Sequence, residues 1–182
     1  MIFPEKEVVL KDGRKYLLRS PGYEDGEAML DYLKTCNGET EFVLRYPDEF
    51  WENAEDEGKF LQKGFESPLN LSIACFDGGA IAASCAISFN SAFKMRHRAS
   101  VGIGVLKRYW GIGMAKAMME ELLKAAGEKE HVDTVELWFI EGNKRAEGFY
   151  RSLGFERVYA RPDAVRLRSG ESLSEIFMVK KL

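Results

Sequence analysis

Two glycines separated by one residue stand where a predicted strand gives way to a predicted helix, and such a turn can bind an anion. The strand ends near Val105, and Gly111-Ile112-Gly113 opens the helix after a short loop. Backbone N–H groups in the first turn of a helix lack partners, and the helix dipole adds partial positive charge there. Glycine removes the side chain that would keep a phosphate away from these amides. Positive charge is added nearby by Lys107, Arg108 and Lys116. The segment is therefore either a diphosphate cradle or only a tightly packed turn.

Two better known phosphate-binding patterns are absent from this segment. It has no G-x-x-x-x-G-K-[ST], which disfavours a nucleoside triphosphatase, and no G-x-G-x-x-G. The elements before it form a hairpin rather than a βαβ unit, which argues against a dinucleotide-binding fold. The 3 cysteines and 2 histidines are scattered without metal-ligand spacing, so we expect no metal site and reduced thiols.

A second patterned stretch is Asn143–Phe155. Its apolar residues recur at the spacing of one helix face: Ala146, Phe149, Tyr150 and Leu153. Asn143 suits the N-cap of this helix, and Gly154 suits its end. Because Asn143 and Tyr150 are two helical turns apart, we expect them to face the same side.

The elements that must position these residues alternate between strand-like and helix-like patterns. Strands are expected at 15–19, 69–76, 80–89, 98–105, 132–140, 155–161 and 175–180. Helices are expected at 24–34, 52–65, 112–126 and 143–153. This order indicates a mixed α/β domain packed in layers.

Glycines mark two places within these strands. Asp77-Gly78-Gly79 predicts a hairpin, and a Gly78-Gly79 loop would place Cys75 opposite Ala82, so no bridge to Cys85 is expected. Gly102 and Gly104 share one face of the strand at 98–105. Two glycines on a strand face suggest that something approaches the backbone there.

Together the two patterned stretches resemble the GNAT superfamily of acyl-CoA N-acyltransferases, over roughly residues 15–182. The helix matches N-x-x-A-x-x-x-Y-x-x-x-G-F, and the turn resembles Q/R-x-x-G-x-G/A. The turn matches literally from Arg108, but the distance from the strand end favours a register that begins at Trp110. The resemblance implies one GNAT domain over 1–182, with a mixed, mostly antiparallel sheet flanked by helices.

The resemblance also implies site residues. The cosubstrate would be acetyl-CoA, with no metal, and its diphosphate would be held by the backbone amides of Gly111, Ile112, Gly113, Met114, Ala115 and Lys116. The pantetheine arm would pair with the backbone of Ile103, Gly104 and Val105. Asn143 would hold that arm, and Tyr150 would contact the cofactor and protonate the departing thiolate.

The general base is where the chain departs from the family. Relatives often place a glutamate at the positions of Ser100 or Trp138, and neither carboxylate is present. Glu136 shares a strand face with Trp138 and is the preferred catalytic substitute. Glu141, His97 and an ordered water remain alternatives.

Charge separates the chain into two parts. Residues 1–70 hold 16 acidic and 9 basic side chains, whereas residues 71–182 hold 13 acidic and 17 basic ones. The acidic helices fit the side that takes a cationic amine, of a small metabolite or of a peptide or protein. The alternative to an acetyl-CoA-dependent N-acetyltransferase is a non-catalytic acyl-CoA-binding or sensing module.

Other partners are disfavoured. The acidic balance and the lack of a basic helix argue against nucleic acid, and no run of about 18 apolar residues predicts a membrane span. The first residues do not read as a secretory signal, so a cytoplasmic location is expected. A homodimer is expected only from the family.

Overall fold

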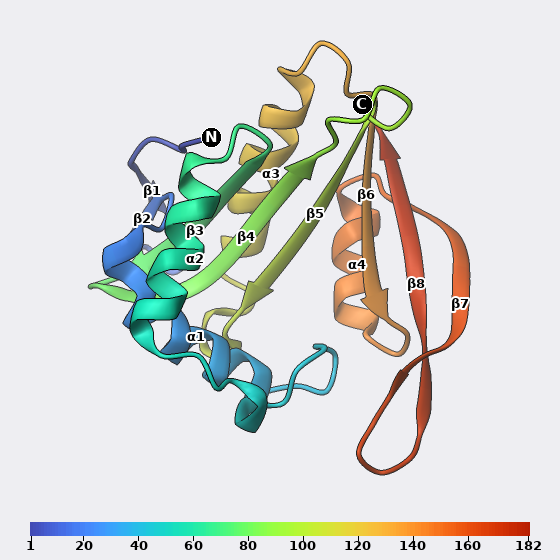
Figure 1. Cartoon of the computed structure of the whole chain (residues 1–182), viewed down its shortest axis with the longest axis horizontal. Coiled ribbons are helices and arrows are strands. Elements are labelled where there is room, and N and C mark those ends of the chain that lie inside the picture. The colour runs from blue at the N-terminus through green and yellow to red at the C-terminus, as the bar shows by residue number, and fades with distance from the viewer.

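The computed structural model describes residues 1–182 and places all of its strands in one eight-stranded sheet (Figure 1). The order across the sheet is β1-β2-β3-β4-β5-β6-β8-β7, and β5–β6 is its one parallel pair. The mixed, mostly antiparallel sheet expected from the sequence is therefore confirmed. The strands are β1 (Lys6–Val9), β2 (Lys15–Arg19), β3 (Asn70–Asp77), β4 (Ala80–Phe89), β5 (Arg98–Val105), β6 (Thr134–Ile140), β7 (Glu156–Arg166) and β8 (Ser172–Lys181).

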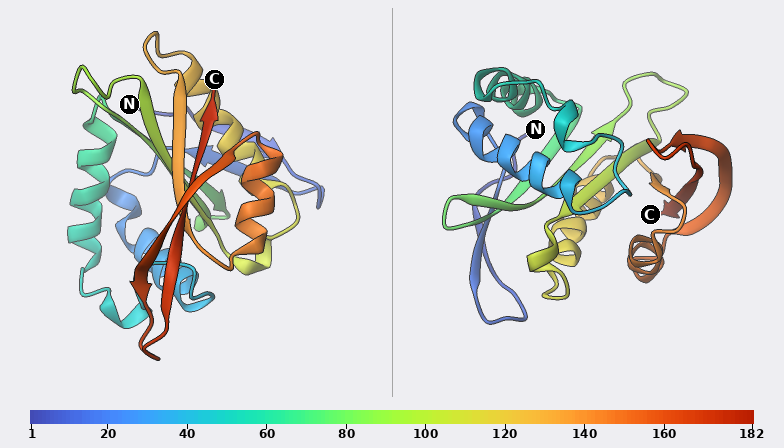
Figure 2. Two further views of the ribbon diagram at one scale, coloured as in Figure 1. Left: turned by 90° about the vertical axis from the view of Figure 1, so that its right-hand side faces the viewer. Right: turned by 90° about the horizontal axis from the view of Figure 1, so that it is seen from below.

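Helices cover both faces of the sheet. Two lie on one face, α1 (Gly26–Gly38) and α2 (Ala54–Glu66), and two lie on the other, α3 (Met114–Gly127) and α4 (Lys144–Ser152) (Figure 2). The helical spacing of α3 predicts an apolar stripe toward the sheet, and its members are buried except for half-buried Ala115: Met114, Met118, Met119, Leu122 and Ala126. No helix is long and apolar enough to cross a membrane.

The β3–β4 hairpin has the predicted loop but a different register beyond it. Asp77 pairs with Ala80, which leaves Gly78 and Gly79 as the loop residues. A bulge after Cys75 then shifts the pairing by one residue, so Cys75 lies opposite Ala83 rather than Ala82. All three cysteines are free and buried.

The feature that shapes the centre of the sheet is the short pairing between β5 and β6. Their parallel register ends at Ser100 and Glu136. Beyond that point β5 stays paired with β4 as far as Val105, while β6 stays paired with β8 as far as Ile140. The two strands therefore diverge, and Figure 1 shows them as the arms of a V.

Helix α1 packs against β5 through one of the two glycines on that strand face. A Cβ atom at Gly104 would lie 2.5 Å from the Tyr32 hydroxyl and 3.3 Å from the Cys36 sulfur. A Cβ atom at Gly102, two residues earlier, would meet nothing within 4 Å. The sequence predicts a close approach to the backbone at both glycines. At Gly104 helix α1 makes this approach, whereas at Gly102 no group does.

This difference predicts opposite outcomes for one substitution at two neighbouring positions. Gly104→Ala should lower the free energy of unfolding by about 1–3 kcal/mol, because the new methyl group overlaps the Tyr32 hydroxyl. Gly102→Ala should leave it within about 0.5 kcal/mol of the wild type. Urea denaturation measures both. Tyr32→Phe should restore much of the loss in Gly104→Ala, and equal losses at the two glycines would contradict the steric explanation.

Candidate active site

Glycine geometry leaves the first turn of α3 open at its N-terminus. Gly113 is the N-cap with φ +92°, in the left-handed region that glycine occupies without strain, and no side chain caps the helix. The first bond of the helix runs from the Ala117 N–H to the Gly113 carbonyl, at 3.1 Å. The backbone N–H groups of 111–116 donate to no backbone carbonyl. Six amides are therefore free to bind an anion, and α3 begins two residues later than the sequence indicated.

The β1–β2 turn supports this cradle from outside the segment singled out in the sequence. The Lys11 N–H donates to the Ile112 carbonyl at 3.0 Å. The Lys11 side chain runs over Gly113, with carbon atoms 3.8 Å from where a Cβ atom would be. Sequence analysis missed Lys11 because nothing local connects it with a turn some hundred residues away.

The free edge of β5 faces the gap between the strands. The Leu106 N–H donates to the Ala82 carbonyl of β4 at 3.1 Å, and backbone groups alternate between the two edges of a strand. Ile103 and Val105 therefore direct their N–H and C=O groups into the gap, where no strand pairs with them. Gly104 directs its own groups to β4, and the space of its missing side chain is taken by Tyr32 of α1.

Trp110 lies where β5 and α4 approach each other across the gap. Its indole N–H donates to the Val105 carbonyl at 2.8 Å, and the Arg145 guanidinium stacks 4.2 Å from its ring centre. Of the two carbonyls that β5 directs into the gap, that of Val105 therefore already accepts a hydrogen bond, and that of Ile103 remains free. Arg108 instead lies over the Tyr109 ring, at 5.0 Å.

The two predicted residues of α4 are positioned differently. Asn143 caps the helix as expected, because its Oδ1 accepts a hydrogen bond from the Ala146 N–H at 3.1 Å. This leaves the side-chain NH2 group available to a ligand.

The Tyr150 ring is buried among aromatic neighbours. Its centroid is 5.9 Å from Phe139, 5.4 Å from Phe149 and 5.9 Å from Phe155. Burial raises the pKa of Tyr150 to about 12. Every fully buried side-chain N or O atom has a hydrogen-bond partner. Because the Tyr150 hydroxyl has none, it is not fully buried and remains accessible to solvent or a ligand.

Glu136 lies at the point where β5 and β6 part. Its side chain is 9% exposed and forms an ion pair with Arg98 of β5. The Ser100 hydroxyl donates to its other carboxylate oxygen at 3.2 Å. Glu136 and Ser100 are the last cross-strand pair, so this cluster forms the apex of the V. Sequence analysis missed Arg98 because a cross-strand ion pair depends on the register.

The alternative bases lie elsewhere. Glu141 follows β6, is exposed, and pairs with Arg157 at 3.4 Å. His97 precedes β5 at the closed end of the V, and its carbonyl accepts the N–H groups of Asp133 and Thr134. Of the three candidate side chains, Glu136 is the one beside the gap. No group of histidine, cysteine, aspartate or glutamate side chains is arranged to hold a metal ion.

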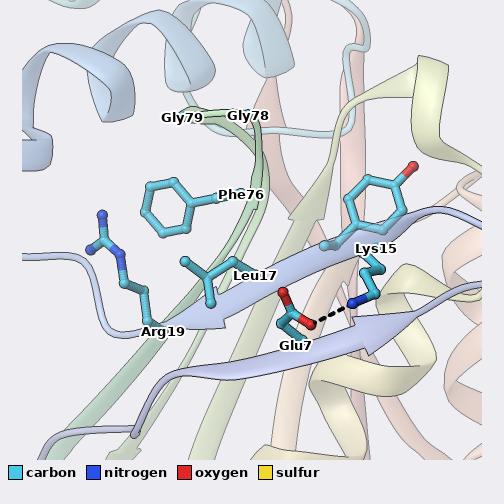
Figure 3. A pocket seen from close by; sticks show the side chains of 8 residues that line it. Glu7, Lys15, Leu17, Arg19, Phe76, Gly78 and Gly79 are labelled. Atoms are coloured by element: carbon cyan, nitrogen blue, oxygen red, sulfur yellow. Dashed lines mark hydrogen bonds and ion pairs between the residues drawn. The ribbon is translucent and has the colours of Figure 1, made fainter.

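A concavity of about 310 Å³ lies away from these residues, near β2 and the β3–β4 turn (Figure 3). Its charged groups already have partners within the protein. Lys15 pairs with Glu7 at 3.0 Å, and Arg19 stacks 4.0 Å from the Phe76 ring centre while pairing with Asp25. The gap between β5 and β6 is therefore the stronger candidate site.

Comparison with known proteins agrees with the fold. Residues 26–155 match the model of the acetyltransferase (GNAT) family, and the chain belongs to this family. The matched range contains the α3 cradle, the V and Tyr150.

Individual relatives extend the comparison. The chain shares 29% identity over 108 residues with the L-amino acid N-acetyltransferase AaaT of Escherichia coli (strain K12). The match covers 59% of this chain and 65% of that protein, so the chain spans just under two thirds of its relative's length. A GNAT-family acetyltransferase from Streptococcus pneumoniae has the same fold, with a TM-score of 0.84 and 23% identity over 92% of this chain and 99% of the other. A ribosomal-protein-alanine N-acetyltransferase from Brucella melitensis gives a TM-score of 0.77 at 20% identity, covering 91% and 99%.

Proposed function

We propose that this chain, as one domain over 1–182, is an acetyl-CoA-dependent N-acetyltransferase that acetylates a primary amine of a small molecule, a peptide or a protein. Two observations carry the proposal. The backbone amides at the start of α3 are free, and the edge of β5 has no partner strand beyond the Ser100–Glu136 pair. A cytoplasmic location and a homodimer stay predictions.

The residues present fit coenzyme A. Six free amides at a helix N-terminus suit a diphosphate. The unpaired backbone groups of Ile103 suit the amides of a pantetheine arm, which would add to the sheet like a strand. The Asn143 NH2 group suits a carbonyl of the same arm. When bound, acetyl-CoA supplies an acyl group activated as a thioester.

Tyr150 is proposed to assist the leaving group. Because its pKa is raised to about 12, the phenol stays protonated across the physiological range and can donate to a developing thiolate. It packs against Phe139, and alternate residues of β6 face opposite sides of the sheet. Tyr150 therefore acts from the α4 face, whereas Glu136 and Trp138 lie on the other.

Glu136 is proposed as the base, acting through Ser100. Arg98 occupies one carboxylate oxygen, and the Ser100 hydroxyl donates to the other. A proton leaving the amine nitrogen would pass to the Ser100 oxygen while the Ser100 proton passes to Glu136. Ser100 stands at a position where relatives often carry a glutamate, so this pair would supply the missing carboxylate from the neighbouring strand.

The second candidate function is a non-catalytic acyl-CoA-binding or sensing module. The absence of carboxylates at Ser100 and Trp138 favours it. Release of free thiol from acetyl-CoA in the presence of a panel of amines separates the two. Turnover supports the enzyme, whereas binding of coenzyme A without turnover on any amine supports the module.

Cofactor binding should depend on Gly113. Calorimetry should detect binding of coenzyme A to the wild type. Gly113→Ala should weaken binding about tenfold, because an L-residue at φ +92° costs about 1–2 kcal/mol and displaces the cradle amides. Gly127→Ala, at the other end of α3 where a Cβ atom meets nothing, is the matched control and should bind normally. Absence of binding to the wild type would refute the cradle.

Loss of the Tyr150 hydroxyl should slow turnover without weakening the cofactor complex much. Tyr150→Phe should lower kcat about a hundredfold. In the wild type, kcat should not decline between pH 8 and pH 10 on account of Tyr150, because the proton-bearing form is lost only as the pH approaches 12. Steady-state rates across this range test both statements. An alkaline decline near pH 10 that disappears in Tyr150→Phe would contradict the raised pKa.

The proposed relay predicts similar behaviour for two residues on different strands. Glu136→Gln and Ser100→Ala should each lower kcat/KM at neutral pH by about tenfold to a hundredfold. The loss should shrink at high pH, where more of the amine is already deprotonated. Glu141→Gln is the control and should retain wild-type rates. Unchanged rates in Glu136→Gln would exclude Glu136 as the base.

A further inference from the structure

We infer that Trp138 binds a planar aromatic group on the acceptor, so the preferred acceptors are primary amines that carry an aromatic ring. This inference rests on the proposed function, because it assigns the acceptor side of the same gap. It concerns a row of three aromatic residues across β6, β8 and β7, here called the aromatic row: Trp138, Phe177 and Tyr159.

The aromatic row is a continuous surface formed by the register of the strands. Phe177 is the cross-strand partner of Trp138 on one side and of Tyr159 on the other. The ring centroids are 5.1 Å apart between Trp138 and Phe177, and 4.9 Å apart between Phe177 and Tyr159. Phe177 is 6% exposed and contacts both outer rings from its position between them. The outer rings are therefore held in place before any ligand arrives.

Exposure distinguishes this row from the rest of the sheet. Trp138 is 42% exposed and Tyr159 is 49% exposed. Every other strongly exposed aromatic side chain lies in a helix, a turn or a loop. Two exposed aromatic rings that flank Phe177 on one sheet face leave apolar surface in water, as ligand-binding surfaces do.

Strand β5, on the other side of the gap, leaves space for a ligand opposite Trp138. Glu136 pairs with Ser100, so the next position on this face is Trp138 on β6 and Gly102 on β5. Gly102 has no side chain, and a Cβ atom there would meet nothing within 4 Å. The space above Gly102 is therefore unoccupied. It lies across the gap from the exposed Trp138 indole, two residues along each strand from the Ser100–Glu136 pair.

Charge around the aromatic row favours an aromatic ring over a second ammonium group. The carboxylates two residues before Trp138 and Phe177 are Glu136 and Glu175. Glu136 pairs with Arg98, and Glu175 pairs with Arg161 at 2.8 Å. Because both carboxylates are already neutralised, the row offers an apolar stacking surface rather than a site for a polyamine. The acidic helices predict a cationic acceptor. The aromatic row narrows this class to acceptors with a single positive charge, carried by the ammonium group that reacts.

The test compares three amines on the full-length protein with acetyl-CoA saturating: 2-phenylethylamine, n-butylamine and 1,4-diaminobutane. The wild type should acetylate 2-phenylethylamine with the highest kcat/KM. Trp138→Ala should lower kcat/KM for 2-phenylethylamine about tenfold, through KM, while n-butylamine changes less than twofold. Trp138→Phe should keep most of the preference. Phe60→Ala, an exposed aromatic residue on α2, is the matched control and should behave as wild type.

The outcomes separate this inference from the proposed function. Equal losses for the aromatic and aliphatic amines in Trp138→Ala, or a wild-type preference for 1,4-diaminobutane, would overturn the aromatic acceptor and leave the acetyltransferase intact. Transfer to no amine would overturn both. An unchanged KM for acetyl-CoA and an unchanged melting temperature in Trp138→Ala would show that the loss lies on the acceptor side.

Discussion

The structure depends on the early end of hydrogen bonding between β5 and β6. Only three residue pairs join these strands before they diverge. Arg98, Ser100 and Glu136 form polar contacts across the last of these pairs, so the strands are held together at the apex. Beyond it, β5 has an edge of backbone groups without a neighbour, which would be costly if it were buried and dry. A ligand with amides of its own can satisfy these groups, and the family to which the chain belongs is consistent with that use.

The V also divides the chemistry between the two faces of the sheet. The cradle of α3 and the Tyr150 hydroxyl belong to the face covered by α3 and α4 (Figure 2). Glu136, Ser100 and Trp138 lie on the face covered by α1 and α2. In the proposed mechanism a proton is therefore removed on one face of the sheet and donated on the other. The acidic N-terminal helices lie on the face proposed for the amine.

Local patterns in the sequence predicted most of the fold and the cradle. The cap at Asn143 and the hairpin loop at Gly78-Gly79 are set by neighbouring residues, and the structure confirms them. Strand β1 was missed because its residues are mostly exposed and show no clear alternation. The bulge after Cys75 and the Arg98–Glu136 pair were missed because both depend on cross-strand register, which a single sequence does not specify. The aromatic row requires the same knowledge of three strands at once.

The Lys11–Ile112 hydrogen bond has a consequence for how the molecule can be divided. The β1–β2 turn lies before residue 26, where the family match begins, yet it touches the cradle directly. A shortened protein starting at that residue would keep the start of the matched range and lose the contacts of Lys11 with the proposed cradle. The structural unit around the start of α3 is thus larger than the range that the family match covers.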